Sequence, residues 1–424
     1  MSFARTIRRA DSLSEKRPTD QLFGRDPMHA RSLLLALVVI VFGSGTLSPG
    51  LQAQAVLRSS SRAVEEPQMP PCALSSREVV LGRDDEDYAG SLAVGEGFCF
   101  VAVPQQTNGF VEVYQDVNGA YALVQTIPAL PGESRFGLRM QFHEGRLFIE
   151  DLGGGLSVYA PNGPAGSWVR VRELPCPRSW DADGTRVAIQ TDWFHVEVRE
   201  RDFGGPDAWG VASTITAPLL PLSPTPKQAY FTWGIFLRGD LLLANVSDTS
   251  INPFTEIWPI VFDRNLGGAN AWGVEFPVPL DKPSLLFATL GTDRLFLQDF
   301  IWMTGQGRNS FRVLGRDVGG PSQWGATTRL PILGQDVGNR MEARHGWGIR
   351  VEAAGYFQPA PAFALYSESE SPSGEPGLAF RGVQAVSCCS IVSSALGDRQ
   401  AAVAVRTSSL TVDVHVFDWQ GCEQ

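Results

Sequence analysis

Short runs in which apolar and polar residues alternate dominate the chain. This period of two is clearest in FHVEVRE, WPIVFDR and SFRVLGR, which cover residues 194–200, 258–264 and 310–316. Alternation of this kind predicts strands whose two faces differ in polarity. Helical periodicity is almost absent, so the pattern predicts an all-β fold.

Each of these three runs leads into a near-copy of one ten-residue segment. The copies are RDFGGPDAWG at 201–210, RNLGGANAWG at 264–273 and RDVGGPSQWG at 316–325. Glycine tolerates the positive φ values that tight loops require, and the tryptophan begins the returning strand. The shared positions are Gly204, Gly205 and Trp209; Gly267, Gly268 and Trp272; and Gly319, Gly320 and Trp324. We expect these three tryptophans to be structural and to be buried against the neighbouring unit.

Weaker copies extend the repeat towards the N-terminus. Residues 154–174 keep Trp168 after a glycine-rich loop, whereas residues 109–127 carry Tyr121 in the corresponding place. Another hairpin precedes each copy, with turns such as Glu144-Gly145. These turns recur about every 50 residues, which predicts a seven-bladed β-propeller of four-stranded antiparallel blades. A linear solenoid is the alternative, but it would expose an apolar face at each end.

The two ends of the repeated region complement each other. The last predicted unit, near residues 386–419, is one strand short of four, and the segment EVVLG at 78–82 is a spare strand before the first unit. We expect residues 78–82 to pair beside the strand near 411–419, so that an N-terminal strand closes the ring and no edge is exposed. Cys72 and Cys422 flank these two segments, which makes them a candidate disulfide.

The first 55 residues have the layout of a secretory leader. Residues 33–43 form an apolar run that is shorter than the ~20 residues a membrane-spanning helix needs. Ala53-Gln54-Ala55 follows as a small-x-small cleavage site, and Met28 lies just before the basic start of the run. An uncleaved N-terminal anchor is the alternative. The expected organisation is a leader and signal peptide at 1–55 with the true start at Met28, a flexible linker at 56–77 and a single propeller domain at 78–424.

Composition and charge narrow the classes of function. The net charge of −10 disfavours a nucleic-acid binder, because phosphate contacts need a basic patch. The same charge disfavours attachment to an anionic membrane surface, and we expect no stable membrane insertion. All six cysteines lie beyond residue 55, and an even count in an exported chain favours disulfides. We expect a secreted or cell-envelope monomer.

One succession of features resembles a known repeat. The order is aromatic-Gly, apolar strand, glycine turn, apolar strand, Gly-x-Val-x-Val-Tyr, glycine-rich loop and Trp, and it resembles the FG-GAP repeat. Phe136-Gly137 carries the aromatic-Gly pair, and the clearest stretch runs from 84 to 174. The resemblance implies the seven-bladed propeller of integrin α subunits and of many exported bacterial proteins.

Many FG-GAP blades carry a calcium loop, and this sequence departs from that pattern. The closest pieces are 181–184 and 116–119, each of which supplies at most two acidic or amide side chains. Calcium needs several oxygen ligands that converge on one cation. We therefore interpret both pieces as ordinary turns and expect no cofactor, although the resemblance would allow calcium.

No recognisable catalytic set occurs in the sequence. It lacks HExxH, GxSxG, a P-loop and a GxGxxG after a strand. Trp180, Trp193, Trp258 and Trp302 break the repeat, so they are better candidates for a face-specific site than the repeat tryptophans. We expect an exported, non-enzymatic, adhesion-type propeller that binds a protein or a glycan. The alternatives are an exported hydrolase or lyase with a site at the central channel, and a purely structural envelope protein.

Overall fold

The structure, a computed structural model, describes part of the 424-residue chain. The described residues are 75–84, 88–105, 109–163, 167–176, 178–220, 227–248, 258–268, 271–277, 285–291, 294–303, 306–317, 324–330, 340–344, 347–352, 362–370, 376–385, 390–397, 400–406 and 411–418. All of them belong to one compact unit, Glu65–Gln424. The expected leader, its cleavage site and the candidate disulfide Cys72–Cys422 lie outside the described residues, as do Gly319 and Gly320. Within the described ranges no helix is long and apolar enough to cross a membrane.

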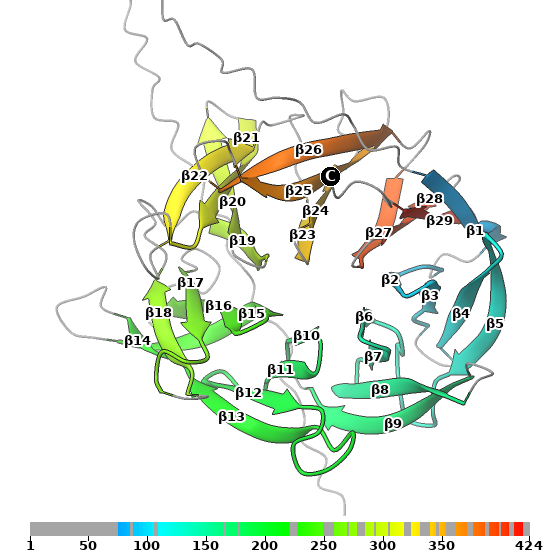
Figure 1. Ribbon diagram of the computed structural model, residues 1–424, viewed down its shortest axis with the longest axis horizontal. Coiled ribbons are helices and arrows are strands. Elements are labelled where there is room, and N and C mark those ends of the chain that lie inside the picture. Colours follow the sequence, from blue (N-terminus) through cyan, green and yellow to red (C-terminus); the bar gives the residue numbers. More distant parts are fainter. Residues whose placement is uncertain are drawn as a thin grey trace, which may run out of the picture. The chain divides into compact units, whose positions relative to one another are not determined.

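The described strands form seven antiparallel sheets, in which the strands follow one another mostly in chain order (Figure 1). Sheet 1 comprises β2 (Ser91–Gly95), β3 (Phe98–Val103), β4 (Phe110–Val117) and β5 (Ala120–Pro128). Sheet 2 comprises β6 (Arg139–His143), β7 (Arg146–Glu150), β8 (Gly155–Asn162) and β9 (Ser167–Pro175). Sheet 3 comprises β10 (Trp180–Asp183), β11 (Arg186–Gln190), β12 (His195–Glu200) and β13 (Gly210–Thr216).

Sheets 4 to 7 continue this arrangement. Sheet 4 comprises β14 (Leu219–Leu220), β15 (Lys227–Arg238), β16 (Leu241–Asp248), β17 (Trp258–Asp263) and β18 (Gly273–Pro277). Sheet 5 comprises β19 (Leu285–Leu290), β20 (Arg294–Met303), β21 (Gln306–Gly315) and β22 (Gly325–Leu330). Sheet 6 comprises β23 (Arg340–Arg344), β24 (Trp347–Glu352), β25 (Ala362–Glu370) and β26 (Pro376–Ala385). Sheet 7 comprises β27 (Ser390–Leu396), β28 (Gln400–Arg406), β29 (Thr411–Asp418) and β1 (Ser75–Asp84).

Successive sheets meet through their innermost strands. Contacts join β2 to β6, β6 to β10, β10 to β15, β15 to β19, β19 to β23 and β23 to β27, and β27 also contacts β2. Four-stranded antiparallel sheets that pack face against face in this way are the blades of a β-propeller. The all-β prediction and the propeller architecture are therefore confirmed.

Strand β1 comes from the start of the described chain and pairs with β29 near its end. In the antiparallel register, Glu78 is opposite His415 and Val80 is opposite Val414, with irregularities on both sides of Val80. This is the strand pairing that the sequence predicted for residues 78–82. Val412, Val414 and Val416 of β29 are buried in a cluster that also holds residues of β2 and β3, so sheet 7 packs against sheet 1.

Sheet 4 differs from the expected four strands. Strand β15 is twelve residues long, and its first two residues extend beyond the part that pairs with β16. These two residues pair instead with the two-residue strand β14, where Leu219 is opposite Gln228. A fifth strand therefore caps the first strand of this sheet because β15 is longer than its partner β16.

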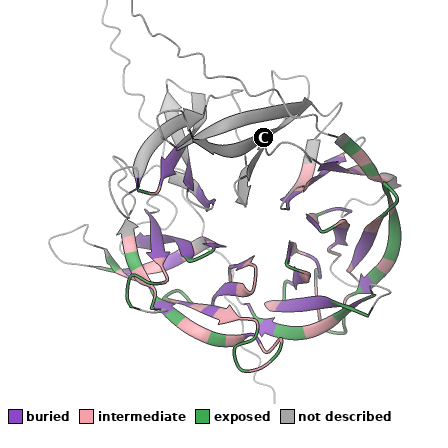
Figure 2. Ribbon diagram, viewed as in Figure 1, coloured by how far each residue is buried: buried purple, intermediate pink, exposed green. Residues whose placement is uncertain are grey.

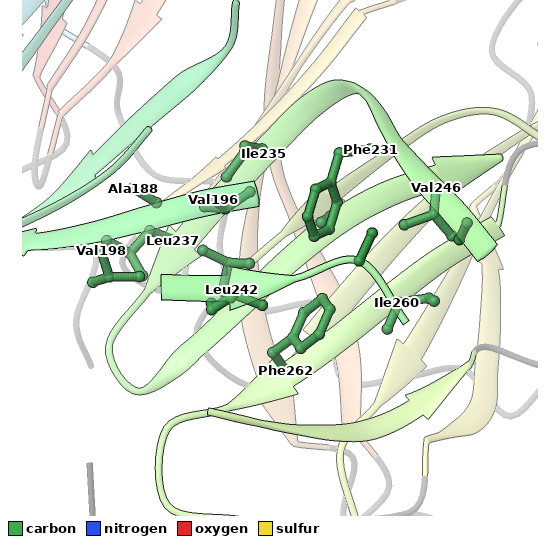
Figure 3. Packing of buried hydrophobic residues seen from close by; sticks show 14 residues of the cluster. Ala188, Val196, Val198, Phe231, Ile235, Leu237, Leu242, Val246, Ile260 and Phe262 are labelled. Carbon is green, nitrogen blue, oxygen red and sulfur yellow. The ribbon is translucent and has the colours of Figure 1, made fainter. Parts of the chain in front are cut away.

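The core lies between neighbouring sheets. Figure 2 shows that strands β3, β7 and β11 are largely buried, while β5, β9 and β13 alternate between exposed and covered residues. One cluster joins residues of β11 to β13 with residues of β15 to β17 (Figure 3). In it, Phe231 and Phe262 lie with their ring centroids 6.3 Å apart. Removing both inner sheet faces from water in this way provides the main stabilisation of the fold.

The tryptophans of the repeat pack against the preceding sheet. Trp209, next to β13, is completely buried and meets the ring of Phe148 on β7 edge-on at 5.4 Å. Trp168 on β9 meets Phe100 on β3 in the same way at 5.1 Å. The remaining two follow this arrangement: Trp324 is buried in a cluster with residues of sheet 4, and Trp272 is partly buried against the cluster of Figure 3.

Two glycine positions of the repeat show why glycine is required there. Gly205 has a φ of 129°, a backbone conformation that residues with a side chain rarely adopt. Gly137 has a φ of 89°, and a Cβ atom there would lie 2.7 Å from the Cβ of Ala102 in sheet 1. The preceding Phe136 is fully buried, so the aromatic-Gly pair is a point of close approach between sheets 1 and 2. Gly204 and Gly268 also have positive φ values, whereas Gly267 is instead confined by the nearby carbonyl oxygen of Ala271.

Candidate functional site

A cavity of 270 Å³ lies where the innermost strands converge. Its lining residues come from β2, β6, β10, β15, β19 and β27, which are the innermost long strands of six sheets. Among the described residues of this lining, Arg139, Asp181 and Arg238 are charged. Hydroxyl groups from Ser91, Thr289 and Ser394 add to its polar wall, so the cavity is a polar site surrounded by apolar sheet cores.

The first strands are held together by a recurring hydrogen bond. An innermost strand has backbone N–H groups that no further strand can accept, and these groups need another partner. In three successive sheets, the acceptor is a polar side chain on the first strand of the preceding sheet. The pairs are Ser91 Oγ with Met140 N at 3.1 Å, Gln141 Oε1 with Ala182 N at 2.9 Å, and Asp181 Oδ2 with Leu237 N at 2.8 Å.

Asp181 is the centre of this arrangement. Only 1% of its side chain is exposed, and it also accepts hydrogen bonds from Gln141 Nε2 and Arg238 Nη1, both at 2.6 Å. Arg238 is itself buried, with 5% of its side chain exposed. The carboxylate therefore joins β6, β10 and β15, and a buried charge of this kind is tolerated because its oxygens are bonded.

Arg139 is held more loosely by the acid and more firmly by a tryptophan. Its Nη2 lies 3.6 Å from Asp181 Oδ1, beyond hydrogen-bond distance. Its Nη1 donates to the carbonyl oxygen of Trp180 at 2.6 Å, and its guanidinium lies 4.8 Å from the centre of the Trp180 ring. Trp180 is completely buried and donates from Nε1 to Glu150 at 2.6 Å. Burial raises the pKa of Glu150, and the bond from Trp180 partly offsets this.

The two segments that resemble calcium loops serve other purposes. In the first, Asp181 bonds nitrogen donors inside the fold, while Asp183 ends β10 and accepts from Gly239 N. In the second, Asp116 accepts from Gly119 N at 2.8 Å, as in an ordinary turn, and forms an ion pair with Arg77. In the described part of the chain, no group of three or more His, Cys, Asp or Glu residues could hold a metal ion.

A second candidate site is an aromatic patch at the loop between β11 and β12. Trp193 and Phe194 are 43% and 38% exposed there. The guanidinium of Arg178, from the connection between β9 and β10, lies 3.6 Å from the centre of the Trp193 ring. Tyr230 of β15 meets the same ring edge-on at 5.6 Å. We call Arg178, Trp193, Phe194 and Tyr230 the aromatic patch.

Backbone bonds fix the position of this patch. Trp193 O accepts from Phe231 N at 2.7 Å, and Phe194 O accepts from Ala217 N at 2.8 Å. Asp192 accepts from the backbone N–H groups of Phe194 and His195 at 2.6 and 2.8 Å. The exposed rings are therefore presented by a loop that is tied to the neighbouring sheet.

The off-repeat tryptophans, which the sequence favoured for a site, have different locations. Trp180 is completely buried in a core cluster, Trp258 packs partly buried against the core, and Trp193 is exposed. The side chain of Trp302 lies outside the described residues. The repeat tryptophans Trp168, Trp209 and Trp324 are buried in the core clusters, and the sequence assigned them to packing.

The cysteines give a partial correction to the disulfide expectation. Cys99 and Cys176 are free thiols, because they are buried in two separate core clusters where neither has a partner cysteine. Burial raises the pKa of each thiol to about 12. The other four cysteines lie outside the described residues.

The sequence matches no protein-family model and no curated protein. The structure is similar to that of BamB from Moraxella catarrhalis, with a TM-score of 0.42 and 10% identity over 78% of this chain and 85% of that chain. It is similar to Sqt1 from Saccharomyces cerevisiae, with a TM-score of 0.42 and 8% identity over 82% and 86%. A chain of the mitotic checkpoint complex gives a TM-score of 0.47 and 10% identity over 90% and 99%.

Proposed function

We propose that this protein is an exported, non-enzymatic scaffold that binds another protein through the aromatic patch. In this proposal the seven sheets are the blades of one ring, which the N-terminal strand β1 closes beside β29, and the repeat is of the FG-GAP type. The pairing of β1 with β29 and the contact between β27 and β2 support the ring. The short apolar run and the Ala-Gln-Ala site in the sequence support export to the cell envelope or beyond.

The observation that carries the proposal is the exposed position of Trp193 beside Arg178. Tryptophan, tyrosine and arginine are the residues that most often dominate the binding energy of protein interfaces. These three residue types occur together in the patch, with Phe194 next to them. A large ring that is exposed although its backbone is fixed loses little conformational freedom on binding.

The geometry favours a protein over a glycan as the partner. Sugar recognition by an aromatic residue uses a bare ring face, on which the apolar side of the sugar stacks. Arg178 lies 3.6 Å over the ring of Trp193, so one face of this ring is covered. With Arg178 over one face and the Tyr230 ring in edge-on contact, the exposed part of Trp193 adjoins the exposed Phe194, which suits an apolar or aromatic side chain of a protein.

Site-specific photo-crosslinking in the native organism tests this proposal. A photoreactive phenylalanine analogue replaces Phe194, and the control position is Phe203, which is 52% exposed in the loop at the opposite end of sheet 3. We expect one discrete crosslinked protein from position 194, none from position 203, and loss of the product in Trp193→Ala. Equal products from both positions, or none, would overturn the proposal. Binding to a glycan array that disappears in Trp193→Ala would replace it with the glycan alternative.

A further inference from the structure

We propose that the central cavity binds a small organic carboxylate and that Arg139 is its receptor. This site is separate from the aromatic patch and does not depend on the proposed protein partner. The 270 Å³ volume is below the usual range for drug-sized ligands, so the occupant is a small molecule.

The charge of the cavity wall selects an anion. Among the described residues that line the cavity, two arginines and one aspartate are charged, which gives this part of the wall one net positive charge. The carboxylate of Asp181 is already bonded within the wall, because it accepts hydrogen bonds from Gln141, Leu237 and Arg238. Arg139 is the more exposed of the two arginines, with 33% of its side chain accessible. The charge presented to a ligand is therefore the Arg139 guanidinium.

Arg139 is prepared to bind a carboxylate before any ligand arrives. A guanidinium has five N–H donors in a planar fork, and that fork matches the two oxygens of a carboxylate. Among the hydrogen bonds of the described residues, Arg139 donates one, to the Trp180 carbonyl. This bond and the contact with the Trp180 ring hold the guanidinium in place while its other donors stay available. Preorganisation of this kind reduces the entropy lost on binding.

The rest of the wall indicates a ligand with hydroxyl groups. Thr289 on β19 and Ser394 on β27 line the same cavity as Arg139 on β6. Each hydroxyl can both donate and accept one hydrogen bond from a ligand hydroxyl. The chemistry that fits is a carboxylate with several hydroxyl groups and about the size of a single sugar ring.

Titration calorimetry on the purified mature chain tests this inference. The probes are D-glucuronate, D-gluconate and L-lactate, and D-glucose is the neutral control of matched size. We expect at least one carboxylate to bind, D-glucose not to bind, and Arg139→Gln to weaken binding at least tenfold. Arg146→Gln is the matched control, because Arg146 forms its ion pair with Asp207 outside the cavity lining, and it should leave affinity unchanged.

Two more variants keep the test decisive. Arg139→Lys retains the charge but not the planar fork, so it should recover only part of the affinity. Ser394→Leu fills the cavity and leaves Arg139 in place, and it should also abolish binding. This variant therefore tests the site even if Arg139→Gln fails to fold. The inference is overturned if none of the three carboxylates binds, if D-glucose binds equally well, or if Arg139→Gln and Ser394→Leu both leave affinity unchanged. Loss of the crosslink at Phe194 would leave this result untouched, so the two proposals fail separately.

Discussion

Replacing Asp181 should reveal how strongly the first strands depend on one buried carboxylate. Asp181→Ala removes the acceptor of three hydrogen bonds, from Gln141 Nε2, Leu237 N and Arg238 Nη1, at a position where 1% of the side chain is exposed. Breaking a buried ion pair by removing one partner costs about 3–5 kcal/mol, because the other charge stays buried without its carboxylate. We expect Asp181→Ala to lower the free energy of unfolding by about that amount.

A double-mutant cycle separates the ion pair from the backbone bond. Replacing Asp181 by Leu and Arg238 by Met together removes both charges and fills their space with apolar side chains. A replacement of this kind often leaves the free energy of unfolding nearly unchanged. The Leu237 N–H then still lacks its acceptor, and that loss costs about 1–3 kcal/mol. The double variant should therefore be more stable than Asp181→Ala alone.

The assay is urea unfolding followed by tryptophan fluorescence. Asp183→Ala is the matched control, because Asp183 is on the same strand but accepts an exposed hydrogen bond, from Gly239 N in the turn between β15 and β16, and it should cost no more than about 1 kcal/mol. A loss below about 1 kcal/mol for Asp181→Ala would refute the reasoning. Additive effects of the Asp181 and Arg238 substitutions would refute it as well.

Four further outcomes follow from burial and charge. Trp209→Ala should destabilise by about 3–5 kcal/mol, and Trp272→Ala by less because Trp272 is only partly buried; equal shifts in urea midpoint would contradict this grading. Arg77→Ala should destabilise by about 1–3 kcal/mol, since Arg77 on β1 pairs with acids of β4 and β29; an unchanged midpoint would contradict this. Burial raises the pKa of Glu150, so the stability of the parent falls as pH rises through that pKa. Glu150→Gln should have a higher melting temperature than the parent at pH 7 but not at pH 4, and a difference in melting temperature that does not depend on pH would contradict this. The Cys99 thiol, whose pKa burial raises to about 12, should react with a thiol reagent at pH 8 only after unfolding.

The strands and their order could be predicted because they depend on local chemistry. The Gly-Gly loops, the alternation before them and the Glu144-Gly145 turn are all determined by a few adjacent residues. The structure places a positive φ of 41° and 67° on that turn pair, as a two-residue hairpin requires. The pairing of β1 with β29 was also predictable, because unit counting left a single spare strand.

The cavity could not be predicted, because its contacts join residues that lie about one sheet apart in the chain. Ser91 and Met140, or Asp181 and Leu237, meet only when two first strands stand side by side. Their spacing varies from sheet to sheet, so no fixed motif marks them. The available signal was weak: Arg139, Gln141 and His143 alternate with apolar residues, as polar positions do in many strands.

Asp181 shows how local chemistry can mislead. Asp-Ala-Asp-Gly has the composition of a turn, but Asp183 still belongs to β10 and the turn falls on Gly184 and Thr185. Strand alternation, however, sends Asp181 to the inner side of β10, where it accepts hydrogen bonds across two sheet boundaries. Turn composition explained Gly184 but not Asp181.

The repeat also carries a link between sheets that the sequence pattern alone did not reveal. Its first residue is an arginine, and in the second and third copies this arginine pairs with the acid that ends the next-to-last strand of the preceding sheet. Arg264 Nη2 lies 2.6 Å from Glu200 Oε1, and Arg316 forms an ion pair with Asp263. In both cases the acid directly precedes the arginine of its own copy, so the middle copy presents Asp263 to the next sheet and Arg264 to the previous one. The register between sheets is thus encoded at the outer loops, beside the repeat tryptophans.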